Sequence, residues 1–146
     1  MKKGIFIFVG ICAAFLAIVF VGIQFVPYGH NHVNPPVTQG PKWDSPQTKQ
    51  LMSAACMDCH SNETVWPWYS NIAPVSWLVQ KDVEEGRVFV NVSELDQGGV
   101  DLNDMVGQIQ KGRMPPLQFL PTHPEAWLTA AQKQQLIDGI QKTFGK

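Results

Sequence analysis

The first hydrophobic feature of the chain is one unbroken apolar segment near the N-terminus. It reads IFIFVGICAAFLAIVFVGIQFV over residues Ile5–Val26, in which only Gln24 is strongly polar. As a helix, these 22 residues would extend about 33 Å, which matches a hydrocarbon core of roughly 30 Å. The segment is longer than the apolar core of a signal peptide and ends without a small-x-small cleavage site. We therefore predict an uncleaved signal anchor over residues 1–26.

The charges that flank this segment predict its orientation. Lys2 and Lys3 precede it, and no charged residue follows until after Tyr28. Positive charges stay on the cytoplasmic side, so we expect a single-pass protein of the cell membrane whose remaining residues lie in the periplasm. Tyr28 would serve as an aromatic anchor at the outer interface. Cys12 lies early in the segment and is interpreted as a small apolar residue in lipid.

Residues 27–43 are rich in proline and glycine and poor in apolar positions, which predicts an extended tether between the anchor and a folded domain. His30 and His32 lie in this tether two residues apart. Such a pair can bind a metal on an extended segment, but no third ligand is near in the sequence, so we expect no metal site there.

Four stretches of residues 44–146 show helical spacing of apolar residues. The first helix is predicted from Pro46 to Cys59 after Ser45 as N-cap, and the second from Pro74 to Gly86. The third would end at Gly112, and the fourth would begin with a capping box at Thr129. The apolar faces are formed by Leu51, Ala54 and Ala55; by Val75, Leu78, Val79 and Val83; by Leu102, Met105, Val106 and Ile109; and by Leu136, Ile137, Ile140 and Phe144. We predict an all-α fold of about four short helices joined by loops rich in Pro and Trp.

Composition and charge narrow the classes of function. Of the 11 basic and 12 acidic residues, Lys2 and Lys3 precede the apolar segment, which leaves nine basic residues against 12 acidic ones. A nucleic-acid-binding protein would present a basic patch, so we expect no nucleic acid as a partner.

One motif in this domain carries chemistry. The residues Cys56-Met57-Asp58-Cys59-His60 fit C-x-x-C-H, the attachment sequence for c-type haem. On a helix, all three side chains would project from one face. Two thiols could then form thioethers with the two vinyl groups of one porphyrin, while the imidazole reaches the iron. We predict one covalent haem c held by Cys56 and Cys59, with His60 as the proximal iron ligand.

Three other hypotheses could account for Cys56, Cys59 and His60. Thioredoxin-like disulfide chemistry would need a βαβ context, which the pattern does not predict. A zinc site would need a second cysteine pair, and the chain has only one further cysteine. A purely structural disulfide would leave His60 unexplained.

The sixth iron ligand has several candidates. Met114 is preferred, because Gly112 ends a helix and two prolines follow, which would present the thioether on a rigid loop. His123 is the main rival and would give a bis-histidine iron of lower potential. An open or water-bound site is the third possibility. Met105 lies on an apolar helix face, and Met52 and Met57 are too close to the attachment site.

Other residues are candidates for contacts with the haem. Trp68 and Tyr69 follow the motif closely and are candidates for haem contacts. Arg87 and Arg113, which precedes Met114, are candidates for pairing with the haem propionates, although the default expectation for an arginine is an exposed side chain. Trp77 and Trp127 are expected in the core. Backbone carbonyls near Pro67 or Pro74 could accept a hydrogen bond from the second ring nitrogen of His60.

The sequence also resembles a known family, the bacterial haem-binding domain family of cytochrome c type. The resemblance extends from about Pro27 to Phe144. It is carried by Pro27-Tyr28-Gly29, Asn34-Pro35-Pro36-Val37, Trp43-Asp44-Ser45-Pro46-Gln47-Thr48, the run Cys59–Ser70, Ala73-Pro74-Val75-Ser76-Trp77, Gly86-Arg87, Met114-Pro115-Pro116 and His123-Pro124. It implies one covalent haem c, usually behind an N-terminal membrane segment, with Cys56, Cys59 and His60 as the haem cysteines and ligand. Two departures from the family are Leu95, where a tryptophan is expected, and an apparent insertion at Gln97–Val100.

These features favour a membrane-anchored electron carrier that is not an enzyme and that works with a redox partner protein. The alternatives are a haem-based sensor or peroxidase-like module with an open distal site, and a haem-bearing subunit of a larger membrane complex.

Overall fold

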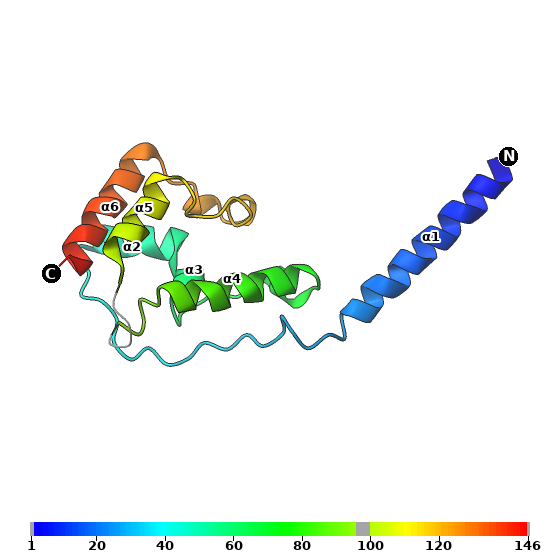
Figure 1. Ribbon diagram of the computed structural model, residues 1–146, viewed down its shortest axis with the longest axis horizontal. Coiled ribbons are helices and arrows are strands. Elements are labelled where there is room, and N and C mark those ends of the chain that lie inside the picture. The colour runs from blue at the N-terminus through cyan, green and yellow to red at the C-terminus, as the bar shows by residue number, and fades with distance from the viewer. Residues whose placement is uncertain (1, 96–99, 146) are drawn as a thin grey trace. The chain divides into compact units, whose positions relative to one another are not determined.

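The structure is a computed structural model that describes residues 2–95 and 100–145. Within these residues it is all-helical and contains no strand, as predicted (Figure 1). Among the described residues, the one β-type feature is an isolated parallel bridge between Gln39 and Glu94. The described residues group into two compact units. One comprises those of Met1–Val33 and Trp66–Asp82, and the other those of Asn34–Val65 and Val83–Lys146.

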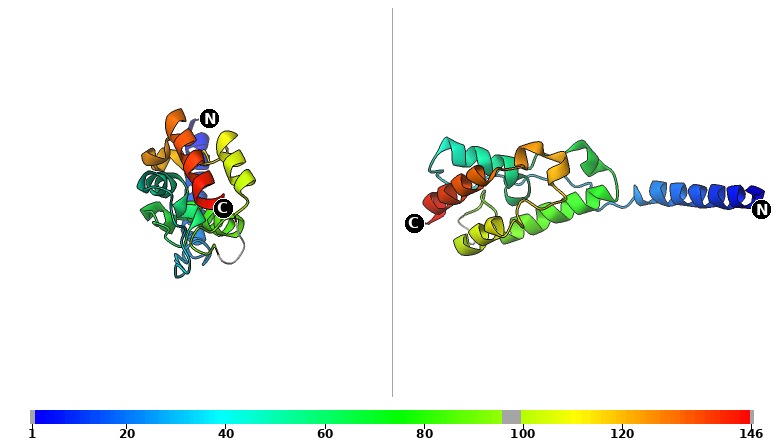
Figure 2. Two further views of the ribbon diagram at one scale, coloured as in Figure 1. Left: turned by 90° about the vertical axis from the view of Figure 1, so that its left-hand side faces the viewer. Right: turned by 90° about the horizontal axis from the view of Figure 1, so that it is seen from above.

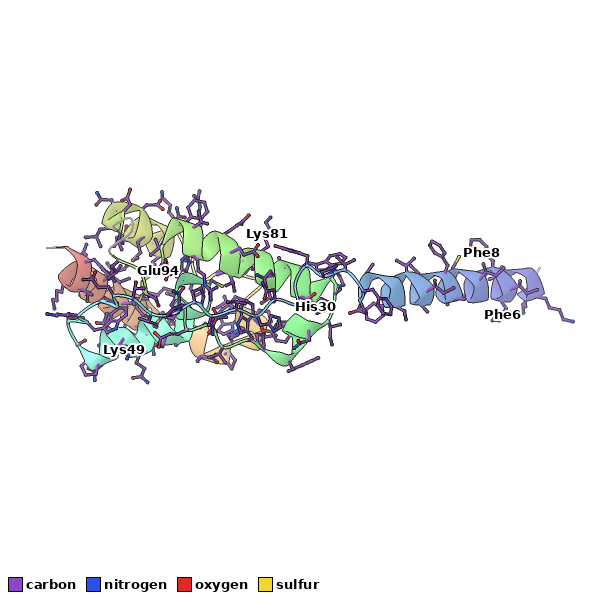
Figure 3. The ribbon with its side chains drawn as sticks, turned by 90° about the horizontal axis from the view of Figure 1, so that it is seen from below. Phe6, Phe8, His30, Lys49, Lys81 and Glu94 are labelled. Atoms are coloured by element: carbon purple, nitrogen blue, oxygen red, sulfur yellow. The ribbon has the colours of Figure 1, made fainter. Side chains whose placement is uncertain are left out.

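The first unit contains helix α1 (Lys2–Ile23), which is 22 residues long and has no buried residue. Its apolar side chains point outward on all sides, and Phe6 and Phe8 project from opposite sides of the helix in Figure 3. By length and composition this helix is able to cross a membrane. An apolar helix that buries none of its side chains in protein is what a lipid environment requires.

The chain that follows α1 packs against a later segment of the same unit. Gly29 has a left-handed φ of 87°, and a Cβ there would lie 2.8 Å from the carbonyl carbon of Ser76. The His32 ring stacks on Trp66 with 4.5 Å between centroids, and its Nε2 lies 3.0 Å from the Ser70 carbonyl oxygen. The first part of the predicted tether is therefore extended but held in place by residues 66–76.

The second unit is built on three helices, α2 (Pro46–Ala55), α5 (Leu102–Gln110) and α6 (Ala130–Phe144). Helix α6, drawn in orange to red, packs against both α2 and α5 (Figures 1 and 2). Between them lies a hydrophobic core formed by Leu51, Met52, Met57, Val92, Val106, Ile109, Leu136, Ile137 and Ile140. Most of these are the apolar positions that the helical spacing indicated.

The predicted ends of the later helices agree with the structure. Gly112 has a left-handed φ of 67° just after α5, and the Asp101 side chain, which was not among the predicted caps, caps the start of that helix. Thr129 and Gln132 form the predicted capping box of α6. Two short 3₁₀ helices, η2 (Leu120–Thr122) and η3 (Pro124–Ala126), connect α5 to α6.

The helix predicted from Pro46 to Cys59 is instead divided at Cys56. That residue has φ −136° and ψ −39°, and it separates α2 from the single turn of α3 (Met57–His60). In one continuous helix, Met52 and Met57 would be about 140° apart around the axis. Both side chains are buried in the same core. The break at Cys56 allows both methionines to face that core.

The helix predicted to stop at Gly86 continues beyond it. Helix α4 runs over Val75–Phe89, and the Val90 N–H still donates to the Gly86 carbonyl. The sequence predicts Gly86 as a C-terminal signal, but this glycine lies inside the helix. Cys59 approaches it so closely that only a residue without a Cβ fits there.

Candidate functional site

The C-x-x-C-H motif occupies the short helix α3. The Cys56 carbonyl accepts hydrogen bonds from the N–H groups of Cys59 (3.2 Å) and His60 (3.0 Å), which closes the turn. The Ser61 hydroxyl donates to the Met57 carbonyl at 2.7 Å, so the end of the turn is also satisfied. The two cysteines and the histidine are thus fixed on one compact turn, each partly buried.

The orientation of His60 is set by two backbone carbonyls of the second unit. Its Nδ1 lies 2.9 Å from the Gly86 oxygen and 3.1 Å from the Val90 oxygen. Carbonyl oxygens only accept, so Nδ1 carries the proton and Nε2 bears the lone pair. Burial lowers the pKa of His60, partly offset by these two hydrogen bonds, which favours the neutral ring.

This arrangement leaves Nε2 available as a metal ligand. In the part of the chain that the structure describes, Nε2 makes no hydrogen bond. The second-ring-nitrogen contact was expected near Pro67 or Pro74, and that expectation was wrong, because the acceptors come from α4 and the residue after it. Because the sequence predicts that this helix ends at Gly86, it does not indicate the carbonyls of Gly86 and Val90 as partners of His60.

Gly86 also permits the close approach of α4 to α3. A Cβ at this position would overlap the carbonyl group of Cys59 and lie 3.0 Å from the Cys59 Cβ. The overlapping atoms are backbone atoms, which cannot move aside as the end of a flexible side chain can. The glycine therefore brings its carbonyl within hydrogen-bonding distance of His60.

The two motif cysteines are not joined in a disulfide. Burial, together with the nearby Cys59, raises the pKa of the Cys56 thiol to about 12. Among the described residues, no group of three or more His, Cys, Asp or Glu side chains is placed to hold a metal ion.

Arg87 fixes the loop that follows the motif. Its Nε donates to the Ser61 carbonyl at 2.8 Å, and one terminal nitrogen donates to Asn34 Oδ1 and Thr64 Oγ1, both at 2.9 Å. Arg87 was expected to be exposed or to pair with a haem propionate. The side chain is partly buried, not exposed, and these hydrogen bonds to the protein hold the chain on both sides of the site.

Asn62 is a second polar centre that sequence analysis missed. Its side-chain nitrogen donates to Glu94 (2.7 Å) and to the Pro36 carbonyl (3.0 Å), and its oxygen accepts from Asn91 (2.9 Å). Asn62 is buried, so these bonds satisfy a side chain that is costly to bury unpaired. Its position directly after the recognised motif was the only available signal.

Met114 packs against the same hydrophobic core as Cys56 and is partly buried. Its backbone N–H donates to the Gln108 carbonyl at 3.3 Å, which folds the loop back on the end of α5. Met52 and Met57 are core residues, and Met105 packs against that core.

His123 makes protein contacts through both ring nitrogens. Its Nδ1 lies 2.9 Å from the Phe119 carbonyl oxygen, and its ring stacks on Phe119 with 3.6 Å between centroids. Its Nε2 faces the Asp58 carboxylate at 3.8 Å. Burial raises the pKa of Asp58, while a hydrogen bond from the Val65 N–H and the nearby His123 lower it.

The remaining candidate contacts have varied positions. Trp68 and Tyr69 belong to the first unit and form an edge-to-face pair with 5.8 Å between centroids. Trp68 is 76% exposed, and Arg113 is exposed as well. Trp127 was expected in the core, but it is 63% exposed and its indole N–H donates to the Leu120 carbonyl at 2.8 Å. That backbone contact, not apolar burial, fixes the ring.

Of the two departures from the family pattern, Leu95 is partly buried. The apparent insertion at Gln97–Val100 lies, apart from Val100, outside the described residues.

An all-helical fold that presents a C-x-x-C-H turn, with its histidine Nδ1 bonded to backbone carbonyls, has the ligand arrangement of haem-binding proteins. The family described as "Haem-binding domain" matches residues 18–142, and the chain belongs to this family. No curated protein and no solved structure was found to match the chain.

Proposed function

We propose that this protein is a membrane-anchored c-type cytochrome that binds one covalent haem and transfers single electrons in the periplasm. The observation that carries the proposal is the state of His60 within the C-x-x-C-H turn. Its Nδ1 proton is held by two carbonyls, and its Nε2 lone pair is left for the iron.

The donor set of the site fits a covalent haem. The thiols of Cys56 and Cys59 form no disulfide and lie on one turn with His60. Their sulfur atoms would form the two thioether bonds to the vinyl groups, and His60 would provide the proximal nitrogen. When bound, the haem iron supplies one-electron exchange between its ferric and ferrous states.

The residues around His60 favour electron transfer over a catalytic role. Donation from Nδ1 to the carbonyls of Gly86 and Val90 makes the imidazole a stronger ligand and restricts rotation of the ring. A fixed ligand suits a redox change that requires little rearrangement. We therefore infer an electron carrier, not an enzyme, which exchanges electrons with a redox partner protein.

We infer that Met114 is the sixth ligand. It lies on the core that also contacts Cys56, and its sulfur is a ligand used by cytochromes c. In His123, by contrast, one ring nitrogen bonds the Phe119 carbonyl and the other faces Asp58. Recruitment of His123 to the iron would require the loss of one of these contacts.

Membrane attachment through α1 completes the proposal. The helix is long and apolar enough to span the bilayer, and Lys2 and Lys3 would remain on the cytoplasmic side.

The test is whether haem stays with the denatured chain. We expect haem to remain in the protein pellet after extraction with acidified organic solvent, and the intact mass to exceed the polypeptide mass by one haem. The double variant Cys56→Ala/Cys59→Ala should release all haem. Cys12→Ala is the matched control and should retain it, because Cys12 lies in α1. Free extraction of haem from the unmodified protein would refute covalent attachment.

A further inference from the structure

A second stretch of the chain lacks charge in the same way as the anchor. No charged residue occurs from Trp66 to Gln80, and Lys81, labelled in Figure 3, is the first. The stretch includes apolar side chains that the protein does not cover. Trp68 is 76%, Val75 43% and Ile72 37% exposed. Exposed apolar groups without interspersed charges are typical of a surface that meets another phase or partner.

Gln24 attaches this stretch to the end of α1. Its side-chain oxygen accepts from the Ala73 N–H at 2.9 Å, and its side-chain nitrogen donates to the Ala73 carbonyl at 3.0 Å. The same nitrogen donates to the Phe20 carbonyl at 3.0 Å, inside the last turns of the helix. Both backbone groups of a fully buried residue are thus bonded to the one strongly polar side chain at the exit of the apolar segment.

Two further contacts hold the same segment. Gly29 lies against Ser76 so closely that no side chain fits, and His32 stacks on Trp66. Residues on both sides of Ala73 are therefore fixed to the chain that leaves α1. All of these contacts are within the first unit.

The length of α1 predicts the depth in the bilayer at which Gln24 bonds Ala73. A helix of 22 residues spans about 33 Å, slightly more than a hydrocarbon core of roughly 30 Å. Gln24 would then lie at the edge of the hydrocarbon, and the headgroup layer beyond it is about 5–8 Å thick. Residues joined to Gln24 by direct hydrogen bonds lie at that level. The neighbouring Phe25 is 82% exposed and would lie in the same layer.

We propose that Trp68, Ile72 and Val75, fixed to the end of α1 through Gln24 and Ala73, insert into the headgroup layer of the bilayer that α1 spans. The inference rests on membrane attachment through α1, as proposed above. Tryptophan favours this layer because its ring is apolar while its N–H can meet polar groups. The absence of charge from Trp66 to Gln80 removes the cost of desolvating an ion. Interfacial burial would also shield the bonds between Gln24 and Ala73 from competing water.

Depth measurements on the full chain test this proposal. In a Cys12→Ala background, single cysteines would be placed at Val19, Ile72, Val75 or Gln135 and nitroxide-labelled after reconstitution into phosphatidylcholine–phosphatidylglycerol vesicles. The signal of the background without an added cysteine is subtracted. Collision rates with oxygen, which concentrates in lipid, are then compared with those of a water-soluble nickel complex.

We expect the oxygen-to-nickel collision ratio to be highest at residue 19. At residues 72 and 75 it should be several-fold higher than at 135, which lies on the exposed face of α6. Adding Ile72→Asp should move the ratio at 75 toward that at 135, whereas Ile72→Leu should preserve it, and neither should alter the haem spectrum.

Two outcomes would overturn the proposal, and they are distinguishable. If residue 19 reports lipid while residues 72 and 75 report water, α1 is an anchor but the segment does not insert, so a protein partner or the haem must cover it. If residue 19 also reports water, the membrane attachment itself fails, and the further inference fails with it.

Discussion

At the scale of single residues, the neighbours of His60 determine how this side chain can act as a ligand. The histidine of any C-x-x-C-H motif is a potential iron ligand. In this protein the carbonyls of Gly86 and Val90 set the tautomer of that histidine, His60. Gly86 in turn can approach only because it lacks a Cβ. A residue with no functional group thus determines which nitrogen of the ligand is available.

Replacing Gly86 by alanine tests this dependence. Alanine usually stabilises a helix by about 0.5–1 kcal/mol relative to glycine. Here the added methyl group overlaps the Cys59 carbonyl, and overpacking of this kind costs about 1–3 kcal/mol. We expect Gly86→Ala to lower the free energy of unfolding, measured by denaturant titration, and to shift the haem absorption spectrum.

The matched control is Gly107→Ala in α5. Its Cβ would meet only the end of the Lys111 side chain, at 4.0 Å. We expect this variant to be as stable as the parent or more stable, with an unchanged spectrum. Equal behaviour of the two variants would show that the contact between Gly86 and Cys59 has no energetic consequence.

The sixth ligand is also a residue-scale question. If Met114 binds ferric iron, a weak long-wavelength sulfur-to-iron charge-transfer band is expected, and Met114→Ala should abolish it while haem stays attached. The midpoint potential should fall, because methionine ligation raises it. These are measured by optical spectroscopy and redox titration.

His123→Ala serves as the comparison and should leave the band intact. A spectrum that responds to the His123 change but not to the Met114 change would identify a bis-histidine iron. If neither variant alters the spectrum and carbon monoxide binds the reduced protein readily, the distal side is open, and a sensor or peroxidase-like role would replace electron transfer.

At the scale of elements, local signals predicted where helices begin better than where they end or break. Capping residues act through hydrogen bonds to N–H groups two or three residues ahead, so Ser45 and Thr129 can be recognised as helix starts in the sequence. The break at Cys56 and the continuation of α4 through Gly86 arise from packing against other parts of the chain, which local propensity does not contain.

The capping box of α6 gives an element-scale prediction. The Gln132 N–H donates to the Thr129 hydroxyl at 3.2 Å, and the Gln132 side chain accepts from the Thr129 N–H at 2.8 Å. Because α6 contributes Leu136, Ile137 and Ile140 to the core, weakening its first turn should weaken the domain. Thr129→Ala should lower the free energy of unfolding by about 1 kcal/mol in denaturant titrations.

Gln135→Ala is the control for this prediction. Gln135 is exposed on the same helix, and a surface change of this kind is expected to stay within about 0.5 kcal/mol. An equal loss in both variants would mean that helix propensity, not the cap, was measured.

At the scale of the whole molecule, one helix, α1, is long and apolar enough to cross a membrane. Helix α1 buries none of its residues in the protein, so its side chains require another apolar environment. The basic residues that precede it, Lys2 and Lys3, predict which side of the membrane receives the rest of the chain.

Topology is tested with a reporter that is active only outside the cytoplasm, fused after Lys146. We expect activity from the full chain, and none from a chain that lacks residues 2–26, because the signal anchor would be missing. A mature N-terminus near Tyr28 would show that the apolar segment is a cleaved signal peptide instead. An inactive full-length fusion, with the chain intact in the membrane, would indicate the opposite orientation.

By itself, the sequence determined the features that arise from neighbouring residues. These include the all-helical class, the apolar N-terminal segment, helix starts such as those at Ser45 and Thr129, and the C-x-x-C-H motif, because each depends on periodicity, caps or spacing over a few positions. Tertiary structure decided the features that depend on distant segments. The carbonyls of Gly86 and Val90 accept hydrogen bonds from His60 Nδ1–H, Arg87 donates to the loop after the motif, and Gln24 bonds Ala73. These partners lie 26 to 49 positions apart. No local pattern encodes such pairings, because a hydrogen bond depends on the distance in space that folding alone sets.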